Sequence, residues 1–206
     1  MAGVKIAYSG TLIAEMDAQG IKTLHTSGKY CKDNIQVAYD PPSGGDDSWV
    51  NRIAGSGTIK WPSGITEIPA YLFYNVKTGD FVFDELPDSV EKVGESAFYS
   101  SYVRNMNITK LPANLITLKN YCFRSIQFEF SVIPAGVESI GSQAFYFNLK
   151  LKEITFRGTP TSIDTNAFAQ CGNLLTINVP WAEGEVKNAP WGATNATINY
   201  NYVEEG

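Results

Sequence analysis

The sequence predicts a mainly β, elongated repeat protein in which short strands alternate with short helical turns. Three observations predict this fold class. Residues 90–98 read VEKVGESAF and residues 137–145 read VESIGSQAF, so one phrase occurs twice. A column of phenylalanines recurs every 22 to 25 residues, and a column of prolines precedes it. A unit of this length cannot bury its apolar face alone, so such a period indicates a solenoid whose neighbouring units cover one another.

The first 40 residues do not follow the repeat. They read as short strands separated by glycine or polar turns, namely VKIAYSG, TLIAEM, IKTLHTS and NIQVAY. A β module of this size buries too little surface to be stable alone, and it needs docking or oligomerisation. We therefore predict a small β-rich attachment module at 1–40. The stretch DPPSGGDDS that follows predicts a linker at 41–48.

The solenoid is predicted over residues 49–180. Each unit is expected to run through a short strand, a proline corner, a second extended piece and one helical turn that carries a phenylalanine. An aliphatic residue lies five positions before each phenylalanine, and both columns are expected to fill the interior. The aliphatic column is Ile68, Val93, Leu118, Ile140 and Ile163, and the aromatic column is Phe73, Phe98, Phe123, Phe145 and Phe168.

Three units depart from the common pattern. The third, LKNYCF, lacks both the glycine and the alanine of the repeated phrase, and the first has Pro69 in place of the glycine. Altered turns are expected in both. In the fifth unit Pro160 lies three residues before Ile163, whereas the other prolines lie six residues before the aliphatic position. A different corner is therefore expected in the fifth unit.

The phrases LPDSVEKVGESAF and IPAGVESIGSQAF resemble the BspA-type leucine-rich repeat, over roughly residues 59–180. This resemblance implies a surface adhesion or interaction module without catalytic machinery. The segment KTLHTSGKYCKDNIQVAY and the closing stretch at 177–202 resemble parts of tailed-phage and prophage structural proteins of gut Firmicutes. They imply a prophage tail-associated protein that attaches to the virion, or to a second copy, through residues 1–40. Residues 181–206 are expected to cap the solenoid.

Composition restricts the choice of partner. The chain has 16 lysines and arginines against 21 aspartates and glutamates, for a formal net charge of −5, which argues against nucleic acid. No apolar run approaches the length of a membrane helix, and the start MAGVKIAYSG lacks the apolar core of a signal peptide. We expect a virion-associated protein, or a bacterial cell-surface protein from which an export signal was removed.

Residue patterns for catalysis are missing. His25 is the only histidine, and Cys31, Cys122 and Cys171 show no metal-ligand spacing and predict no disulfide framework. The chain contains no GxxxxGK loop and no GxSxG elbow. We predict a non-enzymatic binding protein without cofactor or metal. Two alternatives stay open: a bacterial cell-surface adhesin that binds host protein or glycan, and a carbohydrate-active enzyme on a repeat scaffold.

The candidate ligand-binding residues follow the phenylalanine column. Consecutive residues of a helical turn point about 100° apart, so the neighbour of an inward phenylalanine points to the edge or the surface. Stacked units would line these side chains into a ladder that suits sugar faces and protein contacts, or they merely cover the edge. Arg124 and Ala169 occupy the same position in two units. The predicted site residues are Tyr74, Tyr99, Tyr102, Tyr146 and Phe147. A second candidate surface is the polar row Asp84, Thr109 and Ser131.

Overall fold

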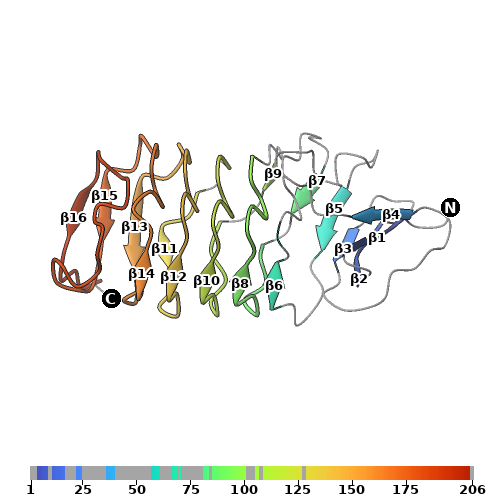
Figure 1. The fold of residues 1–206 in the computed structure, drawn as a ribbon, viewed down its shortest axis with the longest axis horizontal. Coiled ribbons are helices and arrows are strands. Elements are labelled where there is room, and N and C mark those ends of the chain that lie inside the picture. The colour runs from blue at the N-terminus through green and yellow to red at the C-terminus, as the bar shows by residue number, and fades with distance from the viewer. Residues whose placement is uncertain are drawn as a thin grey trace.

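The structure, a computed structural model, describes residues 66–68, 70, 85–100, 109–126 and 129–204, and the backbone of the strands outside these ranges. The described repeats form a rod of stacked turns with short parallel strands on two walls (Figure 1). The fold class predicted from the sequence, a β-rich leucine-rich repeat solenoid, is confirmed. The part of the chain that the structure describes contains no helix with the length and apolarity needed to span a membrane.

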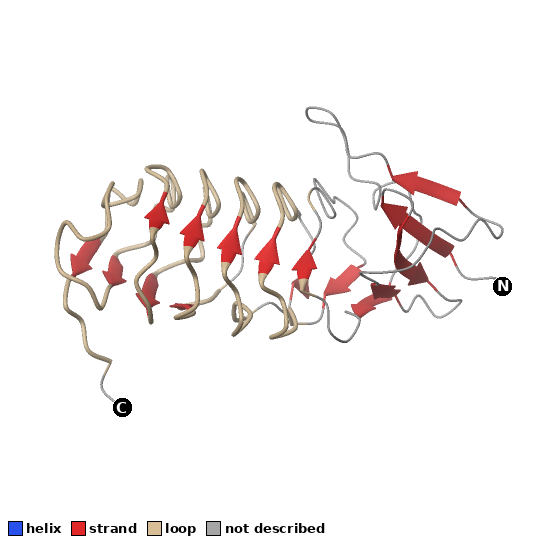
Figure 2. Cartoon of the chain, turned by 60° about the horizontal axis from the view of Figure 1, so that its bottom comes forward, coloured by secondary structure: helices blue, strands red, loops and turns tan. Residues whose placement is uncertain are grey.

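One wall is a parallel sheet to which each of five units contributes one two-residue strand, and Figure 2 shows these strands side by side. The register pairs each aliphatic-column residue with its counterpart in the next unit. All five are buried, with at most 2% of the side chain exposed, so this column is confirmed. The strands are β6 (Glu67–Ile68), β8 (Lys92–Val93), β10 (Thr117–Leu118), β12 (Ser139–Ile140) and β14 (Ser162–Ile163).

The other wall is a four-stranded parallel sheet made of β11 (Val132–Ile133), β13 (Glu153–Phe156), β15 (Thr176–Asn178) and β16 (Thr197–Asn199). A third sheet of seven strands is ordered β4-β1-β2-β3-β5-β7-β9. Its strands are β1 (Val4–Tyr8), β2 (Thr11–Met16), β3 (Lys22–Leu24), β4 (Gln36–Tyr39), β5 (Gly57–Lys60), β7 (Phe81–Phe83) and β9 (Asn105–Met106).

The phenylalanines stack along the interior of the rod. Ring centroids are 5.3 Å apart between Phe98 and Phe123, 5.8 Å between Phe123 and Phe145, and 5.1 Å between Phe145 and Phe168. All four side chains are completely buried, which confirms the predicted column, while Phe73 lies outside the described residues. Trp191, also completely buried, follows Phe168 at the spacing of the repeat. The core therefore continues beyond the five units read from the sequence.

The helical turn expected at each phenylalanine does not form, and the described residues contain no helix. The residue two before the phenylalanine is left-handed in the second, third and fourth units, with φ of 52° at Ser96, 58° at Tyr121 and 52° at Gln143. A right-handed helix requires negative φ throughout. The amide groups of these turns instead donate hydrogen bonds to the next unit, as Ser96 N does to Asn120 O at 2.9 Å. Bonds between units thus replace the bonds inside a helix.

The proline corners form as expected. In the second, third and fourth units the proline carbonyl accepts a hydrogen bond from the amide three residues later, as between Pro87 and Val90 at 3.0 Å. The third unit keeps the common turn, so the altered turn expected there was wrong, and Pro69 lies outside the described residues. The fifth unit has a different corner, as expected: residues 157–158 form a bend instead of the bonded turn, because Pro160, at the position of the donor, has no amide hydrogen. There, the Cα of Gly158 passes so close to Ala135 that a Cβ would lie 2.2 Å from its carbonyl oxygen.

Two of the three cysteines lie in the described interior as free thiols. Cys122 is completely buried and Cys171 is 4% exposed. Burial disfavours the thiolate, so it raises the pKa of the Cys122 thiol well above its ordinary value and that of Cys171 to about 11. Cys171 also lies with its Sγ 3.0 Å from the Phe145 carbonyl oxygen. Both act as small core residues, and Cys31 lies outside the described residues.

Candidate ligand-binding surfaces

The residues that follow the column phenylalanines are held in register by hydrogen bonds between units. Ser100 N donates to Arg124 O at 2.8 Å, and Ser125 N donates to Tyr146 O at 2.8 Å. Phe147 N donates in the same way to Ala169 O at 3.0 Å. Because the bonds repeat at equivalent positions, they bring side chains that are more than 20 residues apart in the sequence into one line along the edge of the rod.

Arg124 lies between two of the predicted tyrosines. Its Cζ is 5.2 Å from the ring centroid of Tyr99, 4.1 Å from that of Tyr146 and 5.9 Å from that of Tyr121. A guanidinium at these distances is attracted by the negative faces of the rings. All four side chains are half-buried. The predicted row of tyrosines is thus an alternating stack of ring, guanidinium and ring.

Phe147 extends this stack outward. Its ring centroid is 6.4 Å from that of Tyr146, and its side chain is 43% exposed. Its φ of 57° is left-handed, as at the equivalent Ser100, Ser125 and Gln170. The other units place a small or polar residue at this position, where a bulky apolar side chain gains little from burial. We name Tyr99, Arg124, Tyr146 and Phe147 the turn-edge ladder. The predicted Tyr74 and Tyr102 lie outside the described residues.

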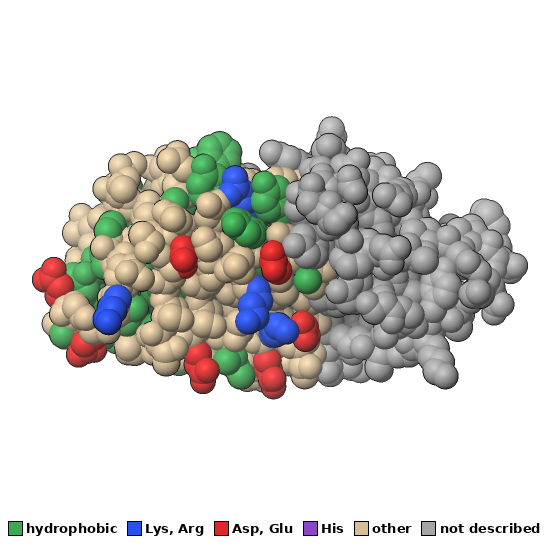
Figure 3. Space-filling view, in the orientation of Figure 1, with side chains coloured by type: hydrophobic (Ala, Val, Ile, Leu, Met, Phe, Trp, Pro, Cys, Tyr) green, Lys and Arg blue, Asp and Glu red, His purple; other side chains and the backbone are tan. Residues whose placement is uncertain are grey.

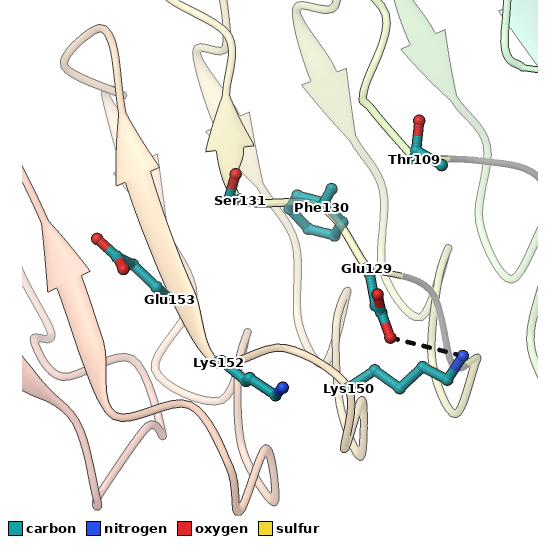
Figure 4. A pocket seen from close by; sticks show the side chains of 7 residues that line it. All are labelled: Thr109, Glu129, Phe130, Ser131, Lys150, Lys152 and Glu153. Atoms are coloured by element: carbon teal, nitrogen blue, oxygen red, sulfur yellow. Dashed lines mark ion pairs between the residues drawn. The ribbon is translucent and has the colours of Figure 1, made fainter.

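A hollow opens on the wall formed by the four-stranded sheet, beside β11 and β13 (Figure 4). Its volume is about 250 Å³, and a second hollow of about 530 Å³ adjoins it. Thr109 and Ser131, two members of the predicted polar row, line both hollows together with Phe130, whereas Asp84 lies outside the described residues. We name this surface the strand-face groove. The first hollow is lined by Thr109, Glu129, Phe130, Ser131, Lys150, Lys152 and Glu153.

Charged groups of the strand-face groove are largely engaged with one another. Lys150 lies 3.8 Å from Glu129, the pair marked by the dashed line in Figure 4. Glu153 accepts a 2.7 Å hydrogen bond from Asn178 Nδ2. Lys110 contacts both carboxylate oxygens of Asp88, at 3.0 and 3.1 Å, and with the Ala113 amide it lowers the pKa of Asp88. Exposed pairs of this kind add little stability, but they leave few charges available for a ligand.

Opposite charges are also close together outside the strand-face groove. On the described part of the face shown in Figure 3, acidic and basic side chains are interspersed, and no single-sign patch gathers. Arg157 forms a bidentate pair with Glu204, at 3.0 Å for each bond, which raises the pKa of Arg157 and lowers that of Glu204. Among the described residues no group of three or more metal-ligating side chains gathers.

Sequence reasoning missed the part that Arg124 plays in the ladder. The signal was present, because Arg124 occupies the ladder position of the third unit and a planar cation between two aromatic positions predicts stacking. The groove residues Glu129, Phe130, Lys150, Lys152 and Glu153 were also missed. These residues follow no repeat pattern in the sequence. The hollow depends on the distance between neighbouring strands, which the sequence pattern does not indicate.

Comparison with known proteins identifies one match. A family model described as BspA type leucine rich repeat region, in six copies, matches residues 66–189. The match does not extend to the amino-terminal module or to the last residues of the chain. No curated protein and no solved structure matches the chain.

Proposed function

The chain belongs to the BspA-type leucine-rich repeat family, and we propose that it is a non-enzymatic adhesion protein whose turn-edge ladder contacts a ligand on a cell surface. One observation carries this proposal. The ladder combines an exposed Phe147 ring, two half-buried tyrosines and a stacked guanidinium on one edge of the rod. Aromatic and arginine side chains supply most binding hot spots, because they give large contact areas for little lost rotamer freedom.

The ladder is favoured over the strand-face groove because its cation, Arg124, is not held in an ion pair among the described residues. In the groove, Lys150 is paired with Glu129 and Lys110 with Asp88. In the ladder, Arg124 contacts rings, and no carboxylate among the described residues pairs with it. A ligand can therefore add contacts to the ladder without breaking an existing ion pair, which would cost binding free energy.

Replacing Tyr99, Tyr146 and Phe147 together with serine is expected to weaken binding to isolated bacterial cell walls at least about tenfold, since the variant removes the hot-spot rings. The melting temperature should change by only a few degrees, because all three side chains lie outside the core. The matched control removes the groove's hydroxyl and cation through Ser131→Ala and Lys152→Ala. Retained binding in the ladder variant, with loss in the groove variant, would assign adhesion to the groove.

For the biological setting, we propose a prophage tail-associated structural protein, with a bacterial cell-surface adhesin as the alternative. The support is the resemblance of the segment ending in NIQVAY and of the stretch at 177–202 to tailed-phage proteins. Genes beside the coding sequence separate these settings. Tail and capsid genes favour the first, and sortase or secretion genes favour the second.

Residues 1–40 are proposed to attach the rod to a virion or to a second copy. The full chain is expected to sediment as an oligomer, because a module of this size buries too little surface to be stable without a partner. A chain starting at Asp46 lacks this module and is expected to be a folded monomer. Sedimentation velocity of both chains, with circular dichroism of the shorter one, measures this. Equal monomeric masses for the two chains would contradict self-association through residues 1–40.

A further inference from the structure

We propose that the turn-edge ladder binds an extended acidic polysaccharide, with Arg124 taking the carboxylate of one sugar while Tyr146 and Phe147 carry the faces of neighbouring sugar rings. The inference rests on the proposed function and specifies the ligand of the same surface. Three features of the ladder support it: a cation that no carboxylate among the described residues neutralises, the period of the stack and the side chains that end it.

Arg124 differs from Lys92 and Arg157 in how its charge is satisfied. Lys92 lies 2.8 Å from Glu67, and Arg157 forms a bidentate pair with Glu204. Arg124 contacts aromatic rings instead, and its buried Nε has no hydrogen-bond partner among the described residues. Stacked rings occupy the faces of a guanidinium and leave its edges. Because Nε is buried, the edge left to a carboxylate is the end with the two Nη groups, which can donate parallel hydrogen bonds. The ladder therefore offers an anion site at its centre.

The period of the stack favours a sugar chain over a peptide. Column rings in successive units are 5.1 to 5.8 Å apart, and the ladder shares this period because the same turns carry it. One pyranose unit of an extended β-1,4-linked polysaccharide has a similar length. An extended peptide places side chains on one face about 6.6 Å apart, so it drifts out of register within a few units. A linear polysaccharide can thus present one sugar to each ladder position.

The carboxy-terminal end of the ladder leaves room for a sugar ring. The next two ladder positions after Tyr146 hold Ala169 and Gly192, and a Cβ on Gly192 would lie 2.8 Å from that of Ala169. At the ladder position itself, no large side chain follows Tyr146 in the next two units. The exposed ring of Phe147 lies alongside. The rings of Tyr146 and Phe147 therefore lie one unit away from the Arg124 cation. With this spacing, one sugar of the chain can contact the rings while its neighbour places a carboxylate at Arg124.

The test uses the full chain and two probes that differ only in charge, a β-1,4-linked oligoglucuronate and its methyl ester. Titration calorimetry should show that the free acid binds roughly tenfold tighter than the ester, as expected for a charge-assisted hydrogen bond. Arg124→Gln should abolish this preference, and Arg124→Lys should restore only part of it, because lysine keeps the charge without the planar fork. Lys152→Gln, which removes the same charge from the strand-face groove, should keep the preference. Thermal melts establish that each variant is folded.

The outcomes separate this inference from the function on which it rests. Equal binding of acid and ester, lost in the serine variant of the ladder, would overturn the acidic ligand and leave adhesion through the ladder intact. An acid preference that survives Arg124→Gln would place the anion site elsewhere and overturn the assignment. Binding of poly-L-glutamate with the same dependence on Arg124, and no binding of the oligoglucuronate, would identify an acidic protein as the ligand and overturn the polysaccharide.

Discussion

Replacing Phe145 with alanine is expected to lower the free energy of unfolding by about 3 to 5 kcal/mol. Phe145 is completely buried at the centre of the aromatic column. Its ring lies 5.8 Å from that of Phe123, 5.2 Å from that of Phe130 and 5.1 Å from that of Phe168. Truncation removes the buried ring and leaves a cavity between two units that the backbone hydrogen bonds hold apart, so the site cannot close fully.

The matched control is the same substitution two residues later. Phe147 is 43% exposed, so Phe147→Ala is expected to change stability by no more than about 1 kcal/mol. Urea denaturation of the parent and both variants measures the difference. If Phe145→Ala unfolded at the same urea concentration as Phe147→Ala, the column would not be the core of the rod and the unit frame would be wrong.

Replacing Gly158 with alanine is expected to destabilise the rod by about 2 to 3 kcal/mol, the usual cost of overpacking a tight contact. A Cβ at Gly158 would meet the Ala135 carbonyl oxygen at 2.2 Å and the Ala135 Cα at 2.8 Å. The obstacle is backbone of the preceding unit, so no side-chain rotation relieves it. The following strand, β14, is paired to β12 and resists a shift of the loop.

Gly172 provides the control for this prediction. An added Cβ there meets only the Cδ2 of Leu149, at 4.0 Å, an ordinary contact distance. Gly172→Ala is therefore expected to change stability by no more than about 0.5 kcal/mol. If Gly158→Ala and Gly172→Ala had comparable denaturation midpoints, the backbones of units four and five would not be in close contact at Gly158 and Ala135.

The buried columns were predictable because burial acts on every unit in the same way. The same interior surrounds the rings of Phe98, Phe123, Phe145 and Phe168, so a large apolar side chain recurs at the period of the stack. Trp191 fills the next position with a different aromatic residue. A search for phenylalanine alone therefore stopped one turn early, although the spacing continues.

The turn conformation was not predictable from residue types. Left-handed φ values occur at Ser96, Tyr121 and Gln143, which share neither size nor polarity and include no glycine. Left-handed backbone costs about 1 to 2 kcal/mol for most residues. Inter-unit hydrogen bonds such as that from Phe98 N to Cys122 O, at 2.8 Å, stabilise it here. These bonds exist only once the units are stacked, so a single unit carries no sign of them.

The candidate surface was predictable in position but not in chemistry. Counting one residue beyond each phenylalanine located Tyr99 and Tyr146 on the edge of the rod. The contact of Arg124 with both rings depends on the distance between units and on the register of the turns. The polar row at Thr109 and Ser131 likewise became a hollow only when the strands around it were placed.

The central claim is that the turn edge, and not the strand face, contacts the ligand. Hydrogen exchange of the full chain, with and without bound cell-wall fragments, tests it most directly. Slower exchange is predicted in peptides covering 96–100, 121–125 and 143–147, the turns that carry the ladder. Protection confined to 129–132 and 150–153, the segments that line the strand-face groove, would contradict the claim.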